Sequence, residues 1–303
     1  MISHFIDRSH WNLFIALSKR DIAQRYRGSL LGFLWALIAP LLMLTVYAFV
    51  FRVVFQTRWP VSSVPLTNPA DRPAPIVDLI QKLPEGLGFA FNLFIGLIVF
   101  SAFSEAIAKA PRLVLDHPQL VRRVVFPLPL LGFVLAATSL FQALMQWIVM
   151  IVVMIATLLF LLISASATSL DTILGLSFWF LSAVPTALCI LFCMVPVLLG
   201  ISWLLAALGT YFRDLQHATP ALMSILMFLG PVFYPISALP EQFRDWAHLN
   251  PITLIAEEIR LVLLFGGETD RGALALYVCI GSLFAMAAYA LFSRVRRGFA
   301  DVL

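Results

Sequence analysis

Residues that could do chemistry are few in this sequence, and most of them stand beside or between apolar runs. One such group interrupts the apolar run 252–265. It consists of Glu257, Glu258 and Arg260. Charge near lipid is costly, so we expect these side chains to pair with one another or with Arg52 or Arg244. We interpret the group, together with Tyr234, as a gate at an outer mouth of the protein. Simple exposure to water is the alternative.

A second group lies in the segment 109–129, which combines charge with four prolines. Its candidate contact residues are Asp116, His117, Pro118, Leu120, Arg122 and Arg123. A short helix here, held stiff by prolines at both borders, would expose Leu120 between charged side chains. Such a rigid, amphipathic helix would be suited to contact with a cytosolic partner. An ordinary positively charged inner loop is the alternative interpretation.

A third group is the basic cluster Arg20, Arg25 and Arg27, which precedes a long uncharged run. No Asp, Glu, Lys, Arg or His occurs from residue 28 to residue 51. Apolar residues recur at near-helical spacing within residues 1–28, which predicts an amphipathic helix in the membrane interface. A plain flank that only sets the orientation of the first crossing is the alternative.

No catalytic constellation accompanies these groups. The sequence has no GxxxxGK[ST] phosphate loop and no HExxH zinc motif. The predicted crossings carry no carboxylate pair or histidine relay, the groups that proton-coupled carriers use. The three cysteines stand in apolar runs and are interpreted as small hydrophobic residues, so we predict no metal site. If the chain moves a substrate, the energy must come from a partner.

Composition places the chain in a membrane. Of its 303 residues 61% are hydrophobic and 12% charged, with a mean hydropathy of +0.97. Soluble domains are about half apolar and about a quarter charged. The basic residues form short clusters beside apolar runs, which is typical of topology signals and does not indicate nucleic-acid binding.

The apolar runs predict one all-α polytopic membrane domain, 1–303, with six crossings. The predicted crossings are 30–55, 89–108, 130–163, 173–208, 218–235 and 273–292. A proline-rich extracytoplasmic loop, 57–88, follows the first crossing, and a helical hairpin, 236–272, enters the membrane partway from outside before the last one. The bias of Lys and Arg toward the inner segments favours cytoplasmic termini at both ends.

Five blocks of the sequence, in order, resemble landmarks of one transporter family. They are RDIAQRYRGSLLGFLWALIAPL, LVLDHPQLVRRVVFPLPLL, LGTYFRDLQH, PVFYPISALPEQFRDWAHLNPIT and RRGFADVL. Their order and spacing are similar to those of type-2 ABC exporter permeases for polysaccharides. These permeases are the membrane subunits that export lipid-linked O-antigen, capsule or teichoic acid chains.

The resemblance implies a division of labour. The segment from Asp116 to Arg123 would be the coupling helix that docks on a separate ATPase, with Arg213 and Asp214 as a second inner contact. Two permease chains would form the channel, and two ATPase chains would hold ATP and Mg²⁺, so that this chain itself has no cofactor and is no enzyme. The setting would be a bacterial inner membrane.

The resemblance also implies a glycan substrate carried on undecaprenyl diphosphate. Arg20, Arg25 and Arg27 would meet the diphosphate, because guanidinium geometry matches phosphate; anchoring in lipid headgroups is the alternative. The loop 57–88 is longer and richer in proline than is usual in the family.

Two other functions stay open at this point. One is an ABC-2 exporter of a small hydrophobic molecule. The other is a membrane enzyme of lipid-linked sugar metabolism, for which the pair Asp116–His117 is the only hint.

Overall fold

The computed structural model describes residues 8–50, 54, 85–121, 126–164 and 170–299. In these ranges the regular structure is helical throughout. The α-helices are α1 (Arg8–Tyr26), α2 (Trp35–Phe49), α4 (Glu85–Lys109), α5 (Pro118–Val121), α6 (Leu130–Ser164), α7 (Leu170–Phe192), α8 (Val195–Tyr211), α9 (Leu215–Leu229), α10 (Glu241–His248), α11 (Pro251–Phe265) and α12 (Arg271–Val295). Short 3-10 helices flank several of them. The predicted all-helical class is confirmed for these ranges.

Five segments of the described residues are long and apolar enough to cross a membrane. They are Gly32–Phe49, Gly88–Arg112, Leu130–Phe160, Phe180–Tyr211 and Arg271–Gly298. The fifth predicted crossing corresponds to α9, which is apolar but has only 15 residues. A perpendicular crossing takes about 20 helical residues. The membrane-spanning character is therefore confirmed, whereas the count of six crossings stays a prediction.

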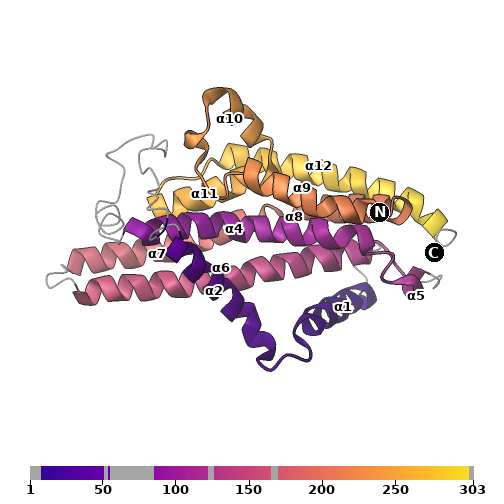
Figure 1. The fold of residues 1–303 in the computed structure, drawn as a ribbon, viewed down its shortest axis with the longest axis horizontal. Helices are drawn as coiled ribbons and strands as arrows, with labels where there is room; N and C mark the ends of the chain where they lie inside the picture. The colour runs from indigo at the N-terminus through magenta and orange to yellow at the C-terminus, as the bar shows by residue number, and fades with distance from the viewer. Residues whose placement is uncertain (1–7, 51–53, 55–84, 122–125, 165–169, 300–303) are drawn as a thin grey trace.

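Helix α4 lies at the centre of the bundle. It is buried over 72% of its apolar span, and it contacts α2, α6, α8, α9 and α11. Figure 1 shows α4, α6 and α12 running along the long axis of the molecule, with α2 lying obliquely against α4 and α6. The spans of α2 and α12 are only 17% and 22% buried. Lipid tails are as apolar as leucine, so such faces need no protein cover.

The long fourth apolar run divides into two helices. Helix α7 ends at Phe192 and α8 begins at Val195, with Pro196 in its first turn. Proline is well tolerated there because the first backbone N–H groups of a helix have no intrahelical partner. Helix α8 packs along α12.

The predicted outer hairpin contains the helix pair α10 and α11. The side chain of Asn250 caps α11 by accepting a hydrogen bond of 3.0 Å from the backbone N–H of Ile252. Gly266 ends α11 with a positive φ of 64°, which glycine adopts without strain. Helix α10 projects from the side of the bundle (Figure 1). How deeply the pair enters a membrane stays a prediction.

Candidate functional site

The predicted coupling segment begins as a continuation of α4. A 3-10 turn, Ala110–Arg112, leads through a loop to the short helix α5. His117 Nδ1 lies 3.0 Å from the carbonyl oxygen of Leu113, and Asp116 is exposed, with its Oδ1 3.7 Å from Nε of Arg112. Leu120 is partly buried and packs on a hydrophobic cluster, so it is less exposed than predicted. Arg122 and Arg123 lie outside the described residues.

Both ends of this segment are fixed to α8. The backbone of Pro111 lies so close to Gly209 that a Cβ at residue 209 would overlap it. At the other end, Nε1 of Trp203 donates a 2.9 Å hydrogen bond to the carbonyl oxygen of Pro129. The segment thus contacts α8 at both ends, and α8 in turn packs on α12.

The predicted second inner contact lies at the same end of the bundle. Arg213 and Asp214 are exposed in the turn between α8 and α9. Figure 1 shows this turn, α5 and the carboxyl end of α12 together at one end of the molecule. The hydroxyl of Tyr211 donates a 3.1 Å hydrogen bond to the carbonyl oxygen of Val295, which holds the turn to α12. The two predicted contact regions thus share one surface.

Arg25 of α1 is held inside the protein by two other helices. It forms an ion pair with Glu105 of α4, in which Nη1 lies 3.2 Å from Oε2, and Nη1 also donates a 3.0 Å hydrogen bond to Oε1 of Gln142 in α6. Lys109 donates to Glu105 from the next turn at 3.0 Å. Burial lowers the pKa of the Arg25 guanidinium, but the hydrogen bond and charge of Glu105 raise the pKa by more, so that the net pKa lies above its ordinary value.

The three arginines predicted to meet a lipid phosphate therefore differ. Arg20 and Arg27 are exposed, and for them this contact stays a prediction. Arg25 already has a carboxylate partner, so a phosphate would have to compete with Glu105.

The apolar face of α1 packs on protein. Leu13, Phe14 and Leu17 contact Leu130 and Val134 at the start of α6. The ring of Trp11, in contrast, is 60% exposed. Helix α1 therefore has a docked face and an open aromatic side chain, and its place in the membrane interface stays a prediction.

The predicted pairing in the outer hairpin is confirmed for Arg260. Its Nη1 lies 2.9 Å from Oε1 of Glu257. The guanidinium is buried and also donates to three backbone carbonyl oxygens. These are Asn92 in α4 at 2.9 Å, and Pro231 and Val232 after α9 at 2.7 and 3.1 Å. Arg260 thereby joins α11 to α4 and to the end of α9.

The other residues predicted at the outer gate have separate partners. Oε2 of Glu258 accepts a 3.2 Å hydrogen bond from the backbone N–H of Asp270, and the hydroxyl of Tyr234 donates a 2.7 Å bond to the carbonyl oxygen of Phe228. Arg244 donates to the carbonyl oxygens of Leu239 and Ser237, and Arg52 lies outside the described residues. Their role as a gate stays a prediction.

Sequence reasoning missed the polar residues that surround Arg25. Ser101 and Glu105 stand four apart in α4, and Gln142 and Gln146 stand four apart in α6. The hydroxyl of Ser101 donates a 2.9 Å hydrogen bond to Oε1 of Gln146. Residues four apart share one helix face, so polar pairs at this spacing in two apolar runs were the available signal.

Comparison with known proteins identifies the family. The family described as ABC-2 type transporter matches residues 12–264, from α1 into α11. This chain belongs to the ABC-2 transporter family. The match includes the segment 109–129, the turn with Arg213 and the Arg260 site.

Curated relatives of this ABC-2 protein match it nearly end to end. An O-antigen export system permease protein, RfbA, from Myxococcus xanthus is 26% identical over 95% of this chain and 94% of its own. A protein of the same name from Klebsiella pneumoniae is 20% identical over 97% and 95%. The polysialic acid transport protein KpsM of Escherichia coli is 22% identical over 90% and 91%.

Proposed function

We propose that this chain is the membrane-spanning permease subunit of an ATP-driven exporter for a polysaccharide. The observation that carries the proposal is the similarity to export proteins for O-antigen and polysialic acid over at least 90% of the chain. The substrate is a glycan linked to undecaprenyl diphosphate, and the membrane is the bacterial cytoplasmic membrane. Both termini lie in the cytoplasm, and the chain itself carries out no chemistry.

The energy comes from a separate cytosolic ATPase. Two copies of this chain form the channel and two ATPase chains bind ATP with Mg²⁺. In support, Asp116, Arg213 and Asp214 are exposed at one end of the bundle, where a cytosolic protein would contact them together. Because the segment 109–129 is fixed to α8 at both ends, a movement of the ATPase would reach the spans α8 and α12.

The coupling role is tested with Asp116→Arg and Arg213→Glu. These exposed positions tolerate substitution, so both variants should insert normally, while the reversed charge should prevent productive contact with the ATPase. We expect loss of surface glycan, measured with glycan-specific antibody, and loss of permease-stimulated ATP hydrolysis in reconstituted vesicles. Arg244→Glu in α10 is the matched control and should keep both activities.

The outcome in cells lacking this chain separates export from synthesis. A permease defect should leave finished glycan on its carrier inside the cell. If the polymer itself fails to form, the protein is an enzyme of glycan assembly and the proposal is wrong. If instead both charge-reversal variants keep wild-type export and ATP hydrolysis, the coupling role is wrong, but the proposed export function is unaffected.

A further inference from the structure

A polar pocket opens beside the Arg25–Glu105 ion pair, between α1, α2, α4 and α6. Its volume is about 430 Å³, and pockets that hold small molecules span about 300–1,000 Å³. Ser101 and Glu105 line it from α4, Gln142 and Gln146 from α6, and Trp35 from the start of α2. These polar side chains interrupt otherwise apolar helices, and polar groups within membrane-spanning helices are rare and usually functional.

The two charged side chains that line the pocket, Arg25 and Glu105, have opposite signs. Arg25 is paired with Glu105, whose Oε1 also accepts a hydrogen bond from Lys109. An anion entering the pocket would have to displace a carboxylate from its guanidinium partner, which is costly for a largely buried pair. The pocket is therefore suited to a neutral ligand.

Hydrogen-bonding groups remain on the wall formed by α6. The side-chain oxygen of Gln142 accepts from Arg25 at 3.0 Å and from Tyr26 at 3.4 Å, and the oxygen of Gln146 accepts from Ser101. Among the hydrogen bonds of the described residues, none uses the amide nitrogen of either glutamine. Each amide nitrogen has two N–H donors that a bound hydroxyl would satisfy.

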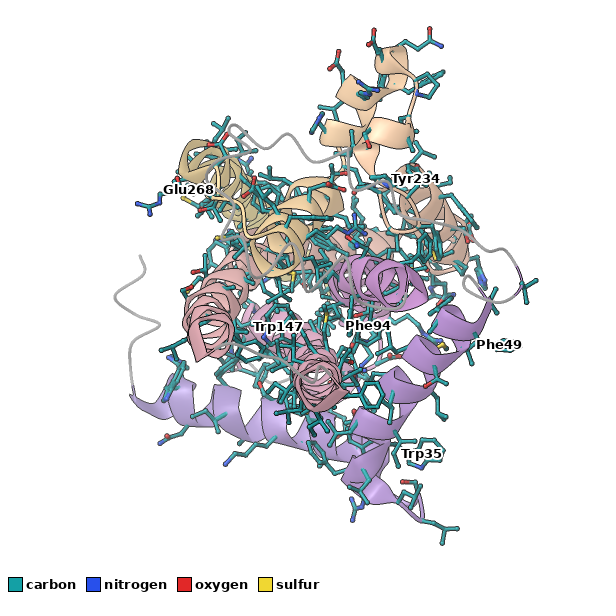
Figure 2. The ribbon with its side chains drawn as sticks, turned by 90° about the vertical axis from the view of Figure 1, so that its left-hand side faces the viewer. Trp35, Phe49, Phe94, Trp147, Tyr234 and Glu268 are labelled. Carbon is teal, nitrogen blue, oxygen red and sulfur yellow. The ribbon has the colours of Figure 1, made fainter. Side chains whose placement is uncertain are left out.

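The wall formed by α2 is aromatic. The indole of Trp35 lines the pocket and is 40% exposed. Figure 2 shows Trp35 and Tyr234 on opposite sides of the bundle, viewed along its long axis. Amides and hydroxyls on one wall and an open indole on the other match the two faces of a pyranose ring, with hydroxyls at its rim and C–H groups on its face.

We propose that this pocket binds a neutral sugar ring of the transported glycan near the inner side of the membrane. The inference rests on the proposed function, because that function supplies the sugar. Gln142 and Gln146 donate to ring hydroxyls, and Trp35 packs on the C–H face. The Arg25–Glu105 pair holds α1 and α4 at the spacing that keeps the pocket open.

The test uses the purified full-length chain in lipid nanodiscs. The probe is an octyl β-D-glucoside with a diazirine on its sugar, applied below its micelle concentration and mapped by peptide mass spectrometry. We expect adducts on α2, α4 and α6 around Trp35, Ser101 and Gln146. Unlabelled octyl β-D-glucoside should abolish them, whereas octyl phosphate of the same chain length should not.

Three variants make the test specific. Trp35→Leu removes the ring, Gln146→Leu removes two donors, and Ala39→Trp fills the pocket without deleting a contact. All three should lose labelling, while Trp35→Phe should retain it. Leu42→Ala, at an exposed position of α2 that does not line the pocket, is the control and should label as the unmodified chain does.

Several outcomes would overturn the inference. Even labelling over the exposed faces of α2 and α6, unchanged in the variants, would show simple partitioning of the probe. Competition by octyl phosphate alone would assign the pocket to phosphate. Either result, with a chain that still exports glycan, would leave the proposed function intact. Sugar-specific labelling of the purified chain, together with normal glycan export in cells that lack the chain, would reject the proposed function and keep the pocket.

Discussion

Two regions of the bundle, the predicted outer hairpin and the predicted inner region around α1, are each held by an arginine, and the two arginines have different kinds of partner. Arg260 at the outer hairpin is 1% exposed and donates to three backbone carbonyl oxygens as well as to Glu257. The Arg25 side chain is 23% exposed, and its hydrogen bonds to described residues go to the side chains of Glu105 and Gln142. Arg260 is therefore enclosed by backbone partners, whereas Arg25 lies beside an open pocket.

The different partners suggest different roles: Arg260 holds helices together, and Arg25 lies where a substrate could bind. Backbone carbonyl oxygens at the end of α9 and within α4 have fixed positions, so an arginine that bonds to them fixes three segments together. The partners of Arg25 are side chains, and one of them, Gln142, keeps amide N–H groups that a ligand can use without breaking the Arg25–Glu105 pair. We therefore assign Arg260 a positioning role and place substrate contact at the inner region.

The largest effect is expected for Arg260→Met. The substitution leaves the carbonyl oxygens of Pro231 and Val232 without their Arg260 donor, whereas the carbonyl oxygen of Asn92 keeps its partner within helix α4. Each unsatisfied buried group costs about 1–3 kcal/mol, so we expect the free energy of unfolding to fall by at least about 2 kcal/mol. Thermal unfolding of the purified chain in detergent measures the loss.

Arg244→Met is the matched control for this prediction. Arg244 also bonds to two backbone carbonyl oxygens, but it is partly exposed, where water replaces the lost donor. Its stability should change by less than about 1 kcal/mol. Equal losses in the two variants would show that burial of Arg260 does not matter, and the bracing role would be wrong.

The sequence predicted the elements better than their contacts. Apolar runs bounded by charge located the spans, whereas the division of the predicted crossing 173–208 into α7 and α8 came from the structure. The pairing of Arg260 with Glu257 was also predictable, since residues three apart on one helix are neighbours. Such features depend on local order in the chain, which a single sequence displays directly.

The pocket could not be predicted because its walls meet only in the fold. Arg25 and Glu105 are 80 residues apart, and Arg25 and Gln142 are 117 apart. The sequence shows that Arg25 precedes the first crossing, which favoured a lipid contact. It does not show that α1 packs on α6 and so turns Arg25 toward α4. Tertiary packing therefore decided the role of this arginine.

An intermediate effect is expected for Gly209→Ala at the inner region. The added Cβ would overlap the backbone of Pro111, which cannot move aside as a flexible side chain would. Overpacking of this kind costs about 1–3 kcal/mol. The strain falls where the segment 109–129 joins α8. Export, measured as surface glycan per inserted protein, should therefore fall even though most of the protein still folds and inserts.

Gly88→Ala in α4 is the matched substitution, since a Cβ there meets nothing within 4 Å. Alanine is the better helix former by about 0.5–1 kcal/mol, so this variant should be at least as stable as the original. If Gly209→Ala behaves like Gly88→Ala in both assays, the close mounting of the segment on α8 has no mechanical role.

The smallest effect on stability is expected for the Arg25–Glu105 pair. Its measurement is the most direct test of the difference between Arg25 and Arg260. A double-mutant cycle with Arg25→Met and Glu105→Gln should give a coupling free energy of about 1–2 kcal/mol, below the loss at Arg260 because both side chains retain some contact with water. The high pKa of Arg25 keeps it charged, so this coupling should stay constant between neutral and mildly alkaline pH.

Glycan export should nevertheless fall in both single variants, since loss of the pair lets α1 move from α4 and alters the pocket. A coupling as large as the Arg260 loss, with export unchanged, would make both arginines simple braces and remove the distinction between the two regions.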